Sequence, residues 1–101
     1  MKGRVDFAAI NAAAPRAAPT LLRRWLPEGR QRSDEWIARN PKRADRHAGS
    51  FRINMRTGRW SDFAVAGAAG GDLISLAAYL CDLSQVEAGR ALGKALGINP
   101  A

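Results

Sequence analysis

The 101-residue chain contains very little cysteine or histidine: Cys81 and His47 are single residues of each type. A lone cysteine cannot form a disulfide within the chain, so we expect a reducing compartment such as the cytoplasm. One cysteine and one histidine also cannot supply the four ligands of an ordinary structural zinc site, so we expect no metal and no other cofactor. Cys81 falls within a predicted helix pair and is interpreted as a buried, inert thiol, whereas His47 is interpreted as a solvated surface residue.

Long hydrophobic runs are also absent. The longest nearly apolar stretch, residues 73–83, has eleven residues and is interrupted by Ser75 and Asp82, whereas about 20 residues are needed to span a bilayer. The first residues of the chain lack the apolar core of a signal peptide. The sequence therefore predicts neither secretion nor a membrane partner.

Acidic residues are scarce relative to basic ones. The chain has 16 Lys and Arg against 9 Asp and Glu, a net charge of +7, and 13 of the basic residues are arginines. Residues 30–59 carry nine basic and three acidic residues, a net charge of +6, whereas residues 60–101 have a net charge of −2. Because arginine binds phosphate in a planar, bidentate way, this distribution favours a nucleic acid as the partner. The alternative is a solvated arginine-rich surface produced by a GC-rich genome.

The acidic residues do not form a recognisable catalytic pair. Asp6, Asp72 and Glu87 stand where helices are predicted to begin, as caps. The glycine-rich segment 67–71 before Asp72 could suggest a phosphate-binding loop, but Asp72 would place a negative charge where the phosphate should lie, so helix capping is preferred. We therefore expect that the chain is not an enzyme.

The N-terminal segment, residues 1–29, is predicted to be a helical lead-in that prolines divide into two short helices. Asp6 is predicted to cap a first helix that Pro15 ends, and Pro19 to open a second helix that Pro27 ends. Residues 28–33 have turn and charge character and are predicted to be a loop.

The middle of the chain is predicted to form short strands over residues 35–39, 50–55 and 59–63. Phe51, Ile53 and Met55 alternate with polar residues, which is typical of a strand with one buried face. Gly58 supplies the turn of a hairpin between the last two strands.

The last third is predicted to be helical, over residues 73–82 and 85–96. Ser84 and Glu87 have the spacing of a capping box. Gly89 and Gly93 would allow the second helix to approach the preceding one closely. The predicted fold class is α+β: a small antiparallel sheet with N-terminal helices and a C-terminal antiparallel helix pair, in which residues 30–101 are the main domain of one compact unit.

The basic residues of the middle segment, interleaved with aromatic ones, form the candidate nucleic-acid-binding site. Basic side chains neutralise phosphates, and aromatic rings stack on unpaired bases. A core role for each aromatic residue is an equal alternative in so small a domain. The candidate site residues are Arg39, Lys42, Arg43, Arg46, Arg52, Arg56, Arg59 and Trp60.

Several short motifs, in their order and spacing, resemble the N-terminal zinc-binding domain of bacterial and phage DNA primases over residues 36–97. The chain also resembles the N-terminal segments of prophage and plasmid primase–helicase proteins, which carry a similar helical lead-in. The motifs are Asn40-Pro41, Gly49-Ser50-Phe51-Arg52-Ile53-Asn54, Thr57-Gly58-Arg59-Trp60, Gly70-Gly71-Asp72-Leu73 and Leu83-Ser84-Gln85-Val86-Glu87-Ala88.

The chain departs from this family at the metal. The resemblance aligns Asn40 and Arg43 with the first cysteine and the histidine of the zinc site, and residues 62–67 with the second cysteine pair. It therefore implies a zinc-free, zinc-ribbon-like hairpin in which side-chain packing replaces the ion. The candidates for that packing are Trp25, Trp36, Trp60 and Phe63.

The resemblance implies a non-catalytic domain that binds single-stranded template DNA in the DNA replication system of a prophage or plasmid. Any nucleotidyl transfer would then occur in another domain or subunit. The alternative is a protein-interaction module that docks onto a replicative helicase, a primase catalytic domain or a polymerase without contacting DNA. A third interpretation is a nucleic-acid-binding regulator of similar shape.

Overall fold

The computed structural model describes residues 4–42 and 49–99, which form three helices and one five-stranded antiparallel sheet. In chain order the elements are α1 (Phe7–Trp25), β1 (Arg30–Arg32), β2 (Glu35–Ala38), β3 (Phe51–Asn54), β4 (Trp60–Asp62), β5 (Ala69–Gly70), α2 (Leu73–Cys81) and α3 (Gln85–Leu96).

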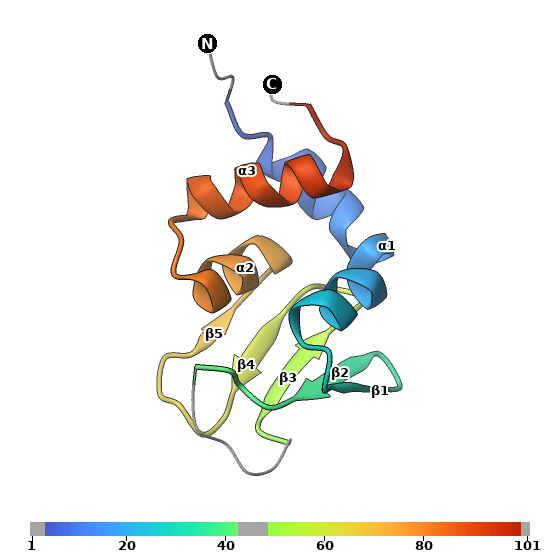
Figure 1. Ribbon diagram of the computed structural model, residues 1–101, viewed down its shortest axis with the longest axis vertical. Helices are drawn as coiled ribbons and strands as arrows, with labels where there is room; N and C mark the ends of the chain where they lie inside the picture. The colour runs from blue at the N-terminus through green and yellow to red at the C-terminus, as the bar shows by residue number, and fades with distance from the viewer. Residues whose placement is uncertain (1–3, 43–48, 100–101) are drawn as a thin grey trace.

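The sheet is a meander in which each strand pairs with its neighbours in the sequence, in the order β1-β2-β3-β4-β5. All three helices lie on one side of the sheet, with α2 next to the strands and α3 beyond it (Figure 1). The predicted α+β class is confirmed. No helix in the described part of the chain is both long and apolar enough to cross a membrane.

The hairpin of β3 and β4 forms as the sequence predicts. Phe51 and Ile53 are buried, while Arg52 and Asn54, which alternate with them, face away from the core. The Asn54 side chain accepts hydrogen bonds from the backbone N–H groups of the next turn, and Gly58 has a φ of +83° that a residue with a side chain would adopt only with strain. The turn chemistry therefore sets the register of the two strands.

The predicted division of the N-terminal segment into two helices is wrong, because α1 is one helix of 19 residues that contains Pro15 and Pro19. Each proline removes one backbone hydrogen bond and costs about 3 kcal/mol in a helix interior. A continuous stripe offsets this cost, since its members all pack into the core; they are Ile10, Ala14, Ala18, Leu21 and Leu22.

The prediction of a loop over residues 28–33 is also wrong. Arg30–Arg32 is strand β1, which pairs with β2 through a tight turn at Ser33, whose φ is +55°. All three residues of β1 are exposed. An edge strand without a buried face has no apolar alternation, so the pattern that predicts strands did not identify it.

Both C-terminal helices begin at the predicted caps. Asp72 accepts a hydrogen bond from the Ser75 backbone, and Ser84 and Glu87 form the reciprocal capping box. The hydrogen bonds between Glu87 and Ser84, backbone and side chain, hold the pKa of the Glu87 carboxyl below its usual value. α2 and α3 run in roughly opposite directions, as predicted (Figure 1).

The expected role of Gly89 and Gly93 needs correction, because both lie against α1 and its leading residues rather than against α2. A methyl group at Gly89 would lie 2.7 Å from Val5 Cγ1, and one at Gly93 would lie 3.1 Å from Ile10 Cδ1. The small residues of α3 therefore let the N-terminal segment pack closely.

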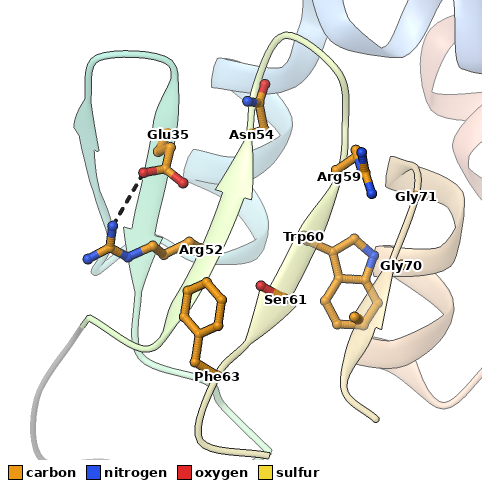
Figure 2. A pocket seen from close by; sticks show the side chains of 10 residues that line it. Glu35, Arg52, Asn54, Arg59, Trp60, Ser61, Phe63, Gly70 and Gly71 are labelled. Carbon is orange, nitrogen blue, oxygen red and sulfur yellow. Dashed lines mark hydrogen bonds and ion pairs between the residues drawn. The ribbon is translucent and has the colours of Figure 1, made fainter.

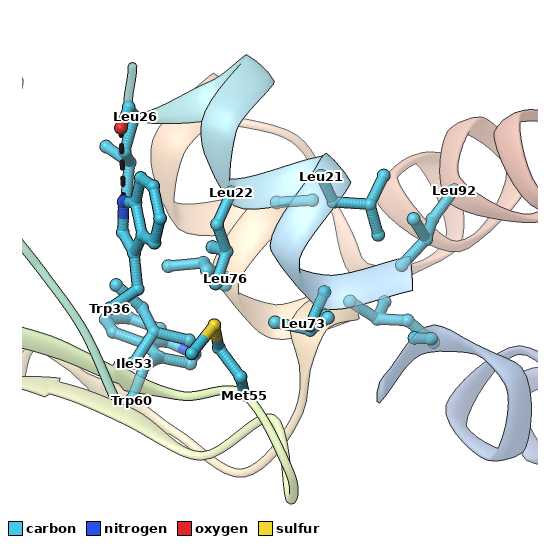
Figure 3. Packing of buried hydrophobic residues seen from close by; sticks show 14 of the residues in the cluster. Leu21, Leu22, Leu26, Trp36, Ile53, Met55, Trp60, Leu73, Leu76 and Leu92 are labelled. Carbon is cyan, nitrogen blue, oxygen red and sulfur yellow. Dashed lines mark hydrogen bonds between the residues drawn. The ribbon is translucent and has the colours of Figure 1, made fainter. Parts of the chain in front are cut away.

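The core lies between the helices and the inner face of the sheet (Figure 3). Trp36 of β2 packs there, and its Nε1 donates to the Leu26 carbonyl oxygen at 3.1 Å, just beyond the end of α1. This bond satisfies a buried indole N–H and fixes the end of α1 against the sheet.

Candidate nucleic-acid interface

The sheet has one face covered by helices and one face without them. Because side chains alternate along a strand, Arg52, Asn54 and Ser61 of β3 and β4 lie on the uncovered face, which we call the outer face. Figure 2 looks onto this face.

An open cleft of about 470 Å³ lies across the outer face. Its polar and charged lining comes mostly from β2, β3 and β4, and its far edge is the short strand β5. The lining residues are Glu35, Arg52, Asn54, Arg59, Trp60, Ser61, Phe63, Ala69, Gly70 and Gly71.

Phe63 is the exposed aromatic residue of this cleft, with 75% of its surface accessible to solvent. Its ring lies beside Arg52 and Ser61 on the outer face (Figure 2). The backbone N–H of Phe63 donates to the Ser50 carbonyl oxygen at 3.0 Å, which continues the strand pairing to this position. The expectation that Phe63 packs in the core is therefore wrong. The alternation in which Trp60 and Asp62 point inward would have placed Phe63 outward.

Arg52 is held in a defined direction along the outer face. Its Nε donates to the Gly49 carbonyl oxygen at 2.9 Å, and its Nη1 lies 3.4 Å from Glu35 Oε1. Both side chains of this ion pair are about 40% exposed. A pair this accessible contributes little to stability.

Arg56 and Arg59 lie around the hairpin turn, and both are exposed. Arg59 lines the cleft beside Gly71 (Figure 2). The structure thus brings Arg52 and Arg59 to one cleft, and Arg56 lies between them in the sequence, at the hairpin turn.

Trp60 is buried rather than presented to solvent, with 5% of its surface accessible. Its Nε1 donates to Ser75 Oγ at 2.9 Å, and its ring packs against Tyr79 at 4.9 Å between centroids and edge-on against Phe51 at 6.2 Å. The expectation that the Trp60 ring stacks on a base therefore needs correction. It fills the core behind the cleft, and Gly70 leaves room for the indole because a side chain there would overlap it.

The remaining candidate residues are distributed differently. Arg39 is exposed immediately after β2. Lys42 is occupied at the end of α2, where its Nζ donates to the Tyr79 carbonyl oxygen at 2.9 Å and forms an ion pair with Asp82. Arg43 and Arg46 lie outside the described residues.

A second concave surface lies on the helical side of the molecule. It is an apolar groove of about 250 Å³ between the end of α1, α2 and α3. Cys81 lines it and is exposed, so the interpretation of Cys81 as a buried thiol is wrong. The groove is lined by Trp25, Pro41, Ala77, Leu80, Cys81, Leu83, Ala91, Leu92 and Ala95.

Comparisons with known proteins relate this chain to others by its fold alone. No protein-family model and no curated protein matches the sequence. One solved structure that matches is the Aquifex aeolicus primase, described as its zinc binding and RNA polymerase domains, with a TM-score of 0.73 and 20% sequence identity. The match covers 96% of this chain and 22% of that one. The chain therefore has a primase-domain-like fold and spans about a fifth of the length of the primase chain it matches.

Proposed function

We propose that this chain is a non-catalytic domain that binds single-stranded DNA on the outer face of its sheet. It would act in the cytoplasm, within the replication machinery of a prophage or plasmid, beside a primase or helicase. The observation that carries the proposal is the exposed Phe63 ring in a cleft that also contains Arg52 and Arg59. The likeness of the fold to part of a bacterial primase supports a role in DNA replication.

The chemistry of the cleft suits an unpaired strand. An exposed aromatic ring stabilises a stacked base by about 1–3 kcal/mol, and stacking on a side chain requires a base that is not already paired and stacked in a duplex. Arg52 and Arg59, which line the cleft, and Arg56 of the adjoining hairpin turn would neutralise phosphates of such a strand. They would contact phosphates rather than read bases, so binding would depend weakly on sequence.

The test is fluorescence anisotropy of a labelled oligonucleotide at several salt concentrations, with the wild type beside the triple variant Arg52→Ala, Arg56→Ala, Arg59→Ala. A phosphate contact contributes about 0.7 to the slope of log affinity against log salt for single strands, so the slope should fall by about 2. Circular dichroism melts should show little change, because all three side chains are at least partly exposed.

A matched control removes three exposed arginines from the helices on the other side of the sheet: Arg16→Ala, Arg23→Ala, Arg90→Ala. This variant has the same net charge as the first, so a difference between them reports position rather than charge. Equal losses of DNA affinity in the two variants would mean that the outer face is not the binding surface. Failure of the wild type to bind at about 50 mM salt, where phosphate contacts are strongest, would contradict DNA binding itself.

The apolar groove favours a second candidate function, docking onto a replicative helicase, a primase catalytic domain or a polymerase. Apolar grooves accept the side chains of a partner segment. Cys81 offers a direct measurement, because its reaction with a maleimide should slow when a partner covers the groove. A thiol that reacts at the same rate with and without a candidate partner would exclude that partner from the groove.

A further inference from the structure

A buried polar pair joins two distant segments of the chain at the end of the sheet away from the hairpin turn. Asn40, just after β2, has 0% of its surface accessible, and Asp62, at the end of β4, has 2%. Asn40 Nδ2 donates a hydrogen bond to Asp62 Oδ2 at 2.9 Å, across 22 residues of sequence. Among the residues that the structure describes, these two are the buried polar or charged side chains.

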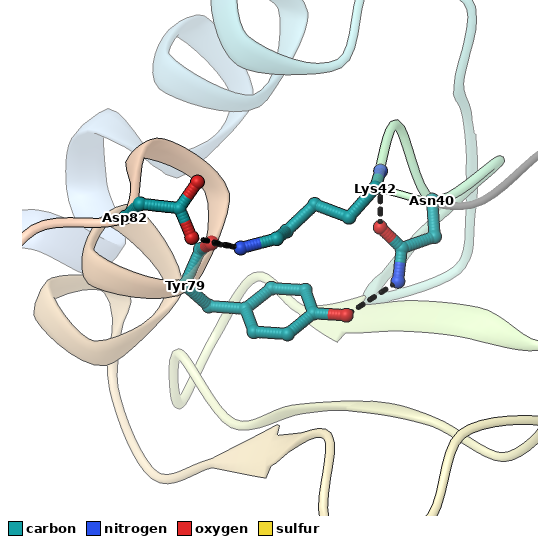
Figure 4. Close-up of polar contacts among 4 residues, drawn as sticks. All are labelled: Asn40, Lys42, Tyr79 and Asp82. Carbon is teal, nitrogen blue, oxygen red and sulfur yellow. Dashed lines mark hydrogen bonds and ion pairs between the residues drawn. The ribbon is translucent and has the colours of Figure 1, made fainter.

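The pair belongs to a network that includes α2. Asn40 Nδ2 also donates to Tyr79 Oη at 2.8 Å, and Asn40 Oδ1 accepts from the Lys42 backbone at 2.9 Å (Figure 4). Asp62 Oδ1 accepts from the Ala64 backbone at 3.0 Å. The network therefore holds the segment after β2, the loop after β4 and the sheet side of α2 together.

These two segments are the ones that the resemblance to primase zinc-binding domains aligns with the two halves of a zinc site. The solved structure with the same fold is likewise described as containing a zinc-binding domain. In this chain the two segments meet as well, but through Asn40 and Asp62.

The described residues of this network do not fit a zinc ion. The Asn40 amide turns its N–H group toward Asp62, and an amide nitrogen has no lone pair with which to bind a metal. Zinc needs ligands that offer a lone pair, in structural sites usually four cysteine or histidine side chains. Within residues 4–42 and 49–99, no three His, Cys, Asp or Glu side chains come together. Cys81 lies exposed in the apolar groove of α2 and α3 rather than in this network.

We propose that the Asn40–Asp62 pair, together with Tyr79, takes the structural place of the metal. A zinc ion ties two chain segments that carry too few apolar residues to hold each other, and its binding is coupled to folding. Here a buried amide–carboxylate hydrogen bond makes the same connection. Loss of either side chain removes a buried hydrogen bond between the two segments, and this loss should destabilise the connection.

The proposal predicts how single and paired exchanges behave. Asn40→Asp alone places two carboxylates in contact and should lower the melting temperature by about 10 °C or more. Asp62→Asn alone replaces the carboxylate that accepts the hydrogen bond from the Asn40 amide by a neutral amide, and it should also lower the melting temperature. The double substitution Asn40→Asp with Asp62→Asn swaps the donor and the acceptor of this hydrogen bond. An aspartate at position 40 can accept from the new asparagine, from the Tyr79 hydroxyl and from the Lys42 backbone. The double variant should therefore be more stable than Asn40→Asp alone.

The experiment is thermal unfolding of the full chain followed by circular dichroism, with Asn99→Ala as the control for an exposed asparagine. A double variant no more stable than Asn40→Asp, or an Asn40→Ala variant as stable as the control, would overturn the proposal. Should the single variants not fold, Tyr79→Phe gives a milder test, because it removes a hydroxyl from the network and keeps the ring.

A measurement on the wild type needs no variant. The melting temperature should be the same within about 1 °C after dialysis against EDTA and after addition of zinc, and metal analysis should find no stoichiometric zinc. Stoichiometric zinc together with a chelator-induced loss of several degrees would overturn the proposal. These results are independent of DNA binding, since none of the exchanged residues lines the cleft of the outer face.

Discussion

The two faces of β3 and β4 differ sharply in exposure and in chemistry. On the inner face, Phe51, Ile53 and Trp60 are almost completely buried against the helices. On the outer face, Arg52 and Ser61, which alternate with them, line an open cleft. Neighbouring residues in one strand thus serve different purposes, because a strand places successive side chains on opposite sides. Stability and recognition should therefore be separable by substitutions one residue apart.

The largest effect is expected on the inner face. Phe51→Ala removes a ring with 0% accessible surface that packs against Trp60 and Tyr79, and it should lower the free energy of unfolding by about 3–5 kcal/mol. Urea unfolding followed by tryptophan fluorescence measures this quantity. Phe63→Ala, the same exchange on the outer face, is the matched control and should change stability by less than about 0.5 kcal/mol. Similar losses for both variants would contradict the distinction between the faces.

The next effect concerns DNA binding, for which the residue of the outer face should matter more than its effect on stability suggests. Phe63→Ala should weaken single-stranded DNA binding by about 1–3 kcal/mol, which is roughly 5-fold to 150-fold, because the base loses its stacking partner. Phe63→Trp should bind at least as tightly as the wild type, since indole offers a larger stacking surface. Anisotropy titrations at one fixed salt concentration give both values. An unchanged affinity for Phe63→Ala would remove the aromatic contact from the proposed interface.

The smallest effect is expected for Glu35, the acidic side chain of the cleft. Glu35→Gln removes the carboxylate that pairs with Arg52, so DNA affinity should rise a few-fold at low salt while stability changes by less than about 1 kcal/mol. Glu28→Gln, an exposed residue before β1, changes the net charge by the same amount and is the control. If both variants bind equally well, the gain comes from net charge and not from release of Arg52.

Local sequence patterns predicted the elements whose determinants lie within a few residues of each other. The capping box of Ser84 and Glu87, the cap at Asp72 and the turn at Gly58 all form as expected, because each depends on a side chain or backbone conformation within one turn. The alternation in β3 correctly separated Phe51 and Ile53 from Arg52 and Asn54.

The same patterns failed where contacts with distant residues decided the outcome. Pro15 is a local signal for a helix end and Pro19 for a helix start, yet the packing of the whole α1 stripe against α3 and the core keeps the helix continuous. Cys81 lies in an apolar helix and still reaches solvent, because it occupies the rim of a groove and not the interface of α2 with the sheet.

The candidate site shows the same division. Charge distribution indicated residues 30–59, and the structure gathers Arg52 and Arg59 from that segment into one cleft. The sequence could not show that Lys42 turns to the end of α2. It did hold the signal for Phe63, because the alternation that buries Trp60 and Asp62 places Phe63 on the outer face.

By itself, the sequence determined the α+β class, the hairpin and the helix caps, because hydrophobic period and capping act between residues close in the chain. Which side chains share a surface follows from packing between distant parts of the chain. Asn40 and Asp62 are unremarkable polar residues 22 positions apart, and their hydrogen bond exists because the strands between them bring both into a place without water. Burial makes such a bond necessary, and burial is a property of the whole fold.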